Sequence, residues 1–280
     1  MESKENSKQS MLHTLLSAPY ILWMIIFIIV PLCMVAYFAF TTSQGSFTLD
    51  NIRAVGQYTN IFVRSIRLAA IATVICLIIS YPAAFILTRM NKSVQSTMLM
   101  IIMLPMWMNF LLRTYAWMTL LGNNGIINTL LKFIDFGSVK LLNTQGAVVL
   151  GMIYNYIPYM ILPLYSVMIK IDKSVLEAAQ DLGCNPPQVL WRVVIPLSVP
   201  GIISGVTMGF VPAISTFIIS RMLGGGSNLL IGDLIEMQFL GNSYNPNLGA
   251  AISLILMVIV LIIMTVMRQF DSSDDDRVLL

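Results

Sequence analysis

Few residues of this 280-residue chain belong to types that perform chemistry, and those few are widely separated. The single histidine, His13, cannot complete a Ser-His-Asp set, and Cys33, Cys76 and Cys184 lack metal-ligand or redox spacing. The triple glycine Gly224–Gly226 is followed by Ser-Asn, whereas a phosphate-binding loop continues with Lys and Ser or Thr. We therefore expect no catalytic residue, no metal and no cofactor in this chain, and we expect that it is not an enzyme.

Two carboxylates stand out because they are three residues apart. On a helix, Asp233 and Glu236 would share one face, where they could attract a cation. Aromatic rings add cation–π contacts worth roughly 0.5–2 kcal/mol each, and the candidates are Trp107, Tyr115, Trp117, Tyr154, Tyr156 and Tyr159. The alternatives are a solvated loop for the carboxylates, and lipid-boundary or packing roles for the aromatic rings.

A third group of residues forms a half-polar stretch between two apolar runs, "EAAQDLGCNPPQVLWRVVIP", residues 177–196. Gly183 suits the position after a helix because glycine tolerates positive φ. Asn185 suits an N-cap and Pro186 the first helical position. The stretch therefore predicts a helix, a tight turn and a second helix ending at Pro196, with one face left open by two small residues, Ala178 and Ala179.

The elements around these residues are apolar enough to cross a membrane. Hydrophobic residues make up 57% of the chain and charged residues only 10%, against about 25% charged residues in soluble domains. A spanning helix needs about 20 apolar residues. The sequence predicts an all-α integral membrane protein with six spanning helices, in the charge-free runs Ala18–Phe40, Leu68–Thr88, Ser96–Leu112 (continued through Arg113 to Leu121), Gly146–Ile169, Leu197–Ser220 and Leu248–Met267.

Smaller features refine this plan. The first run is too long for the apolar region of a signal peptide, so we expect it to be retained. Short helices are expected outside the spans, within residues 122–145 and 228–240. We expect kinks at the prolines inside the runs, which are Pro82, Pro105, Pro158, Pro163, Pro200 and Pro212. Nine basic residues on one side against six on the other favour cytoplasmic N- and C-termini.

The half-polar stretch also carries a family resemblance. The spacing E-A-A-x3-G-x9-hydrophobic-x-hydrophobic-P is similar to the signature loop of ABC importer permeases, the inner membrane components of binding-protein-dependent transport. Its positions here are Glu177, Ala178, Ala179, Gly183, Val193, Ile195 and Pro196. Val193 and Ile195 are mild departures from the usual Ile and Leu. The segments "SYPAAFILTR", "LLRTYAW", "YNYIPYMILPLYS" and "NLLIGDLIEMQFL" resemble the spermidine/putrescine type of this family.

The resemblance implies a type I ABC importer permease that forms half of a translocation pathway for polyamines in the bacterial plasma (inner) membrane. It implies that the 177–196 stretch is a coupling helix that fits into a cleft of a cytoplasmic ATPase. The implied partners are a second permease subunit, two ATPase subunits that carry ATP and Mg, and an extracytoplasmic polyamine-binding protein. The implied domains are a cytoplasmic tail 1–17, a first helix and outer loop 18–65, a permease domain 66–267 with coupling loop 170–199, and an acidic tail 268–280.

Two inferences come from the charges. The six apolar runs hold no Asp or Glu, so acidic groups deep in a polycation pathway would come from a different permease subunit, which predicts a heterodimer in the lipid membrane. Arg113 is an intramembrane charge, and such charges have a functional role by default. We expect it to pair with a partner carboxylate or a helix C-terminus, or to reach the lipid surface. The net charge of +3 is too small to suggest nucleic acid.

Other functions stay open from the sequence. The cargo could be another small solute, such as a phosphonate or an amino-acid-like compound, and an anionic cargo would make Arg113 a ligand. An ion-coupled secondary carrier would need an intramembrane acid, which the runs lack. A membrane scaffold without transport activity is the third possibility.

Overall fold

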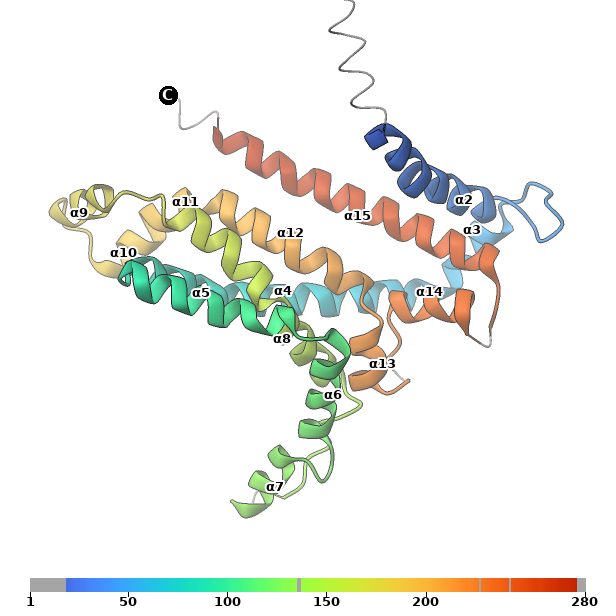
Figure 1. Ribbon diagram of the computed structural model, residues 1–280, viewed down its shortest axis with the longest axis horizontal. Helices are drawn as coiled ribbons and strands as arrows, with labels where there is room; N and C mark the ends of the chain where they lie inside the picture. The colour runs from blue at the N-terminus through green and yellow to red at the C-terminus, as the bar shows by residue number, and fades with distance from the viewer. Residues whose placement is uncertain (1–18, 135–136, 227, 242, 276–280) are drawn as a thin grey trace, which may run out of the picture. The chain divides into compact units, whose positions relative to one another are not determined.

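The computed structural model describes residues 19–134, 137–226, 228–241 and 243–275, with side chains described as far as residue 269. These residues are helical apart from turns, connecting segments and an isolated antiparallel bridge between Thr41 and Phe47 (Figure 1). The chain divides into two compact units. One comprises the described residues up to Tyr58 together with Met237–Val258, and the other comprises Thr59–Glu236 with the described residues from Ile259 onward.

The first unit is built on a membrane-length helix, Pro19–Ala39, which contains a π-helical turn at Ile25–Ile29 before α2 (Val30–Ala39). The short helix α3 (Asp50–Val55) and the 3-10 turn Gly56–Tyr58 follow. Two asparagine amides hold this unit together through backbone carbonyls that lack helical partners. Asn247 Nδ2 donates to the Thr41 carbonyl at 2.7 Å, and Asn51 Nδ2 donates to the same oxygen at 2.9 Å.

The core of the second unit is formed by three helices, α4 (Thr59–Arg89), α8 (Gln145–Met168) and α12 (Val199–Ser215), with α8 in contact with both others. A row of glycines on α12 makes the close approach to α8 possible. A Cβ added at Gly205 would lie 2.8 Å from Met160 Sδ, and one at Gly201 would lie 3.1 Å from the Pro163 carbonyl. Small residues at this spacing are typical of membrane helix pairs.

Four helices are long and apolar enough to cross a membrane, and the number is six if each of two bent pairs forms one span. The predicted six-span all-α plan therefore agrees with the structure, although two of the spans are broken. The four candidates that do not depend on a bent pair are Pro19–Ala39, Asp50–Arg89, Gln145–Met168 and Pro246–Gln269; the last lies within α15 (Pro246–Asp275).

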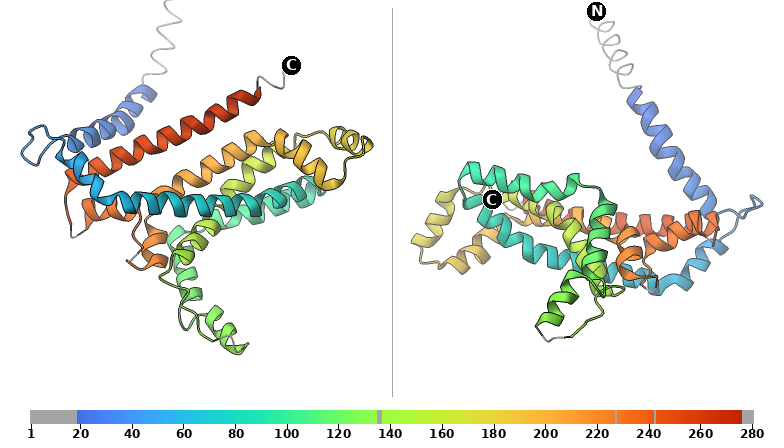
Figure 2. Two further views of the ribbon diagram at one scale, coloured as in Figure 1. Left: turned by 180° about the vertical axis from the view of Figure 1, so that it is seen from behind. Right: turned by 60° about the horizontal axis from the view of Figure 1, so that its bottom comes forward.

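The prediction of a continuous third span through Arg113 is wrong. After α5 (Lys92–Trp107) the chain bends by 90°, because Met108 and Asn109 have extended ψ angles of 148° and 129°. Asn109 Oδ1 then accepts from the Leu111 amide at 2.8 Å and caps a new helix, α6 (Phe110–Leu121). The expected short helix follows as α7 (Ile126–Phe133), and α6 and α7 project from the helices of the core (Figure 2).

The fifth run also departs from prediction. Its helix α12 ends at Ser215, where Thr216 is extended, and a separate helix α13 (Ile218–Gly224) follows. Pro200 lies in the first turn of α12, where its missing N–H breaks no helical hydrogen bond, and the chain bends by 69° just before it, between Leu197 and Val199. The second expected short helix is confirmed as α14 (Ile231–Leu240).

Candidate functional site

The half-polar stretch folds as the predicted hairpin, here defined as Lys173–Leu197. It contains α9 (Lys173–Asp181), α10 (Pro186–Val189), a π-helical turn Leu190–Val194 and α11 (Ile195–Leu197). The turn has the predicted chemistry. Gly183 has a φ of +87°, and Asn185 and Gln188 form a reciprocal capping box with distances of 3.1 and 2.9 Å. The second helix continues one residue past Pro196.

The hairpin has its own small core, which fixes the angle between its helices. Leu176 and Ala179 of α9 pack with Val189 and Val194 of the second helix, and Phe85 of α4 lies against this cluster. The expectation that both alanines leave an open face is therefore wrong. Ala179 is buried between the two helices and only Ala178 is exposed. Helical periodicity places these neighbours about 100° apart around α9, which explains the difference.

The remaining signature residues lie on or near the surface of the hairpin. Glu177, Gly183 and Pro196 are exposed, whereas Val193 and Ile195 are half-buried. Sequence reasoning missed two apolar side chains at the surface: Leu182 is 87% exposed and Trp191 is 70% exposed. For Leu182 the available signal was its place directly before the turn glycine Gly183, where a bulky apolar side chain is expected at the surface. Exposed apolar side chains on a rigid, polar element are typical of a protein contact surface.

The hairpin is tied to the core where its second helix ends. The Tyr81 hydroxyl of α4 and the Ser198 hydroxyl lie 2.8 Å apart, and both residues are buried. The Ser198 hydroxyl also contacts the Ile195 carbonyl at 3.1 Å. The end of the hairpin is therefore joined to α4 by a hydrogen bond shielded from water, where such a bond is strongest.

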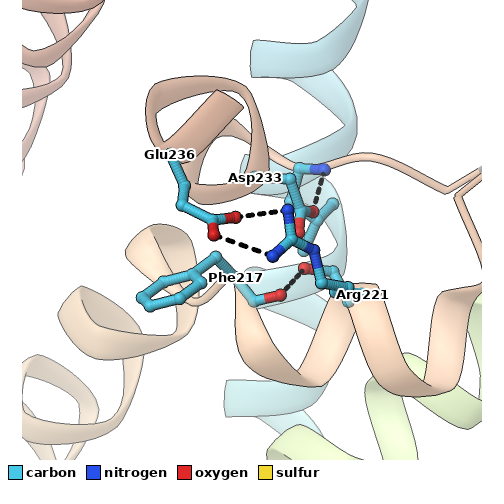
Figure 3. A network of polar contacts seen from close by, with 6 residues as sticks. Phe217, Arg221, Asp233 and Glu236 are labelled. Atoms are coloured by element: carbon cyan, nitrogen blue, oxygen red, sulfur yellow. Dashed lines mark hydrogen bonds and ion pairs between the residues drawn. The ribbon is translucent and has the colours of Figure 1, made fainter. Parts of the chain in front are cut away.

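The two carboxylates predicted to share a helix face do so on α14, and the structure adds a cation between helices (Figure 3). Arg221 of α13 reaches Glu236 with both terminal nitrogens, with Nη1 to Oε1 at 2.7 Å and Nη2 to Oε2 at 2.5 Å. The Arg221 side chain is 53% exposed and the Glu236 side chain 20%. The sequence had indicated Arg221 only as one of the basic residues outside the spans.

Asp233 lies one turn before Glu236 and is 1% exposed. Its Oδ2 accepts from the Leu230 amide at 2.8 Å, and its buried Oδ1 has no hydrogen-bond partner among the described residues. Burial raises the pKa of this carboxyl, and the nearby Ser220 hydroxyl, Leu230 amide and Arg221 charge oppose the rise. The alternative of a solvated loop is therefore wrong for Asp233.

Ser65 and Gly232 anchor this polar network to the core of the second unit. The Ile231 amide donates to Ser65 Oγ of α4 at 2.9 Å. Gly232 packs so closely on the Ser215 and Thr216 carbonyls at the end of α12 that there is no room for a Cβ atom. Phe85, which contacts the hairpin, is 20 residues further along the same helix. At 1.5 Å per residue the two contact points are about 30 Å apart, roughly the thickness of the hydrocarbon core.

The candidate aromatic residues are not gathered in one place. Trp117 and Tyr154 meet edge to face at 5.4 Å, and Tyr156 and Tyr159 at 6.3 Å. The other two are on the outside of α5 and α6, with Trp107 76% and Tyr115 58% exposed. The exposure of Trp107 and Tyr115 is compatible with a surface that faces lipid, with a contact to another subunit, and with a place along the pathway.

Arg113 is 9% exposed, and its guanidinium lies 5.7 Å from the centre of the Phe110 ring. Its Nε and Nη1 are buried without a hydrogen-bond partner among the described residues. The expected pairing with a partner carboxylate stays a prediction, since it depends on another subunit.

Comparison with known proteins identifies the family. Residues 77–273 match the family described as "Binding-protein-dependent transport system inner membrane component". The chain belongs to this family. It is 38% identical over 256 residues to the spermidine/putrescine transport system permease protein PotB of Haemophilus influenzae, covering 87% of this chain and 88% of the relative. The identity to PotB of Escherichia coli is 35% over 247 residues, covering 85% and 90% of the two chains.

Solved structures agree with the fold of a binding-protein-dependent permease. A chain of a bacterial ABC transporter involved in the import of alginate superposes with a TM-score of 0.83, at 17% identity, covering 98% of this chain and 99% of that chain. The structure is thus a type I ABC importer permease fold, and this chain is an inner membrane transport component.

Proposed function

We propose that this chain is a permease subunit of an ATP-driven importer for the polyamines spermidine and putrescine, and that it forms half of the translocation pathway. One observation carries the cargo assignment. Two PotB relatives named for spermidine/putrescine transport match this chain at 35–38% identity, and both matches extend over most of each chain. A shared fold alone would not specify a cargo, since the alginate transporter has the same fold.

In this proposal, ATP and Mg belong to two separate ATPase subunits that receive the hairpin Lys173–Leu197. The hairpin suits this role because its own core and the Tyr81–Ser198 hydrogen bond make it a rigid projection. A rigid projection transmits movement as a rigid-body rotation of helices. The extracytoplasmic binding protein and a second, different permease complete the assembly, and both termini of this chain are cytoplasmic.

The test is uptake of labelled spermidine and putrescine by cells that lack this chain, with and without its restoration. The strain must have no second polyamine importer. We expect uptake to disappear with the chain, to return with it, and to fail when ATP is depleted although the membrane stays energised. Unchanged uptake would reject the polyamine assignment, and uptake that survives ATP depletion would favour an ion-coupled carrier.

A further inference from the structure

The network of Arg221, Asp233 and Glu236 contains two carboxyl groups but only one cationic group. The Arg221 guanidinium contacts Glu236 and acts on Asp233 through its charge alone, and the Asp233 Oδ1 atom has no hydrogen-bond partner within the described part of the chain. The other carboxylates between residues 59 and 269 are Asp135, Asp172, Glu177 and Asp181. The last three lie in or next to the hairpin, about 30 Å away along α4. The Arg221–Glu236 ion pair therefore lies far along α4 from the acidic residues of the hairpin.

Arg221 is the more exposed member of the ion pair with Glu236. Its side chain is 53% exposed and that of Glu236 is 20% exposed, so the cation lies on the more accessible side of the pair. Water can reach the half-exposed guanidinium, which lowers the free-energy cost of separating it from Glu236. Another cation can therefore take its place on the carboxylate.

The backbone beneath the pair is held more firmly than the pair itself. Gly232 lies so close to the Ser215 carbonyl that an added Cβ would be 2.4 Å away, and the Ile231 amide is bonded to Ser65. Asp233 also caps the Leu230 amide. The carboxylates are therefore fixed on α14, whereas the long Arg221 side chain can swing away without moving a helix.

We propose that Arg221 is a tethered counter-ion that occupies the cation site of Asp233 and Glu236 when cargo is absent, and that an ammonium group of a polyamine displaces it. A polyamine carries several ammonium groups, so it can neutralise both carboxylates, which one guanidinium does not. This inference rests on the proposed function and adds a binding site and a competitor to it.

The test is equilibrium dialysis of labelled spermidine with the purified intact transporter, without the binding protein, in lipid nanodiscs. We expect Glu236→Gln to weaken binding about tenfold, as expected for the loss of a charged hydrogen-bonding partner. Arg221→Gln removes the competitor, so binding should become about two- to fivefold tighter. The double variant should bind as weakly as Glu236→Gln alone.

Arg67→Gln is the matched control, because Arg67 donates to the neutral Gln145 side chain at 3.0 Å. We expect it to leave spermidine binding unchanged. A structural ion pair predicts a different pattern, in which Arg221→Gln weakens binding as much as Glu236→Gln does. That pattern, or no measurable binding by either the native or the Arg221→Gln protein, would overturn the inference. Uptake by cells with the native chain tests the proposed function separately.

Discussion

At the scale of single residues, the hairpin depends on a backbone conformation that only glycine adopts without strain. Gly183 has a φ of +87°, and a Cβ added there would meet no other atom within 4 Å. The cost of a substitution is therefore conformational and not steric. A residue with a side chain in this region loses about 1–2 kcal/mol, and asparagine loses less than most.

We expect Gly183→Ala to lower ATP-dependent uptake and to destabilise the turn by about 1–2 kcal/mol. Gly183→Asn is the matched variant and should retain more uptake, because asparagine visits positive φ more readily. Uptake rates are to be compared at equal amounts of the chain in the membrane. Equal uptake by the native chain and both variants would show that the turn conformation does not matter for coupling.

Asp172 gives the hairpin a dependence on pH. Its carboxylate accepts from the Ser174 amide at 3.0 Å, and this bond lowers the pKa of Asp172 from its ordinary value of 3.8. A lowered pKa stabilises the folded helix above pH 3.8, and this stabilisation is lost as the pH falls through the folded pKa. Hydrogen exchange of the first α9 amides should therefore accelerate at acidic pH, after correction for intrinsic rates. Asp172→Asn should remove this pH dependence while keeping the cap.

At the scale of elements, the contact between α8 and α12 depends on where a glycine lies on α12. A Cβ at Gly205 would lie 2.8 Å from Met160 Sδ and 3.2 Å from the Met160 carbonyl, whereas one at Gly209 would lie 3.8 Å from Met160 Cε. There is no room for a methyl group at Gly205, whereas there is room for one at Gly209.

We expect Gly205→Ala to destabilise the assembled transporter by about 1–3 kcal/mol through overpacking. Gly209→Ala, on the same helix, should be neutral or slightly stabilising because alanine favours helix. Thermal unfolding of the two purified variants gives the comparison. A similar loss in both variants would mean that helix flexibility, and not close packing, requires these glycines.

The two alanines of the hairpin make a second comparison at this scale. Ala178 is exposed and Ala179 is buried against Val189 and Val194. In a chain with the native cysteines replaced by serine, we expect Ala178→Cys to form cross-links to the ATPase subunit. Ala179→Cys should form far fewer. Cross-linking yield on denaturing gels measures both. Strong cross-linking at position 179 alone would contradict the proposed docking face.

The sequence predicted elements better than it predicted their ends. Charge-free runs identified all six apolar segments, since membrane burial needs length and composition alone. The breaks at Asn109 and Thr216 were missed because apolar residues continue through both, and only a side-chain cap and an extended ψ mark them. The hairpin was predicted closely because its turn is encoded locally. The Arg221–Glu236 pair could not be predicted, since it joins two residues that are 15 positions apart and lie on different helices.

At the scale of the whole molecule, this chain supplies little negative charge to a pathway for polycations. Its six apolar runs contain no Asp or Glu, and the buried Arg113 guanidinium adds positive charge. A second subunit of identical sequence would repeat this shortage, whereas a different permease can supply carboxylates. We therefore expect two differently tagged copies of this chain not to co-purify from cells that express the whole transporter. Recovery of both tags in one complex would contradict the heterodimer.

One helix, α4, touches both candidate sites, through Ser65 at α14 and through Phe85 at the hairpin. In the proposed transporter this arrangement imposes reciprocity. If cargo at α14 and nucleotide at the ATPase each bind two arrangements of α4 with different affinities, the two binding events are coupled, and each changes the free energy of the other by the same amount. Spermidine should then alter the affinity of the intact complex for ATP by the same factor by which ATP alters its affinity for spermidine.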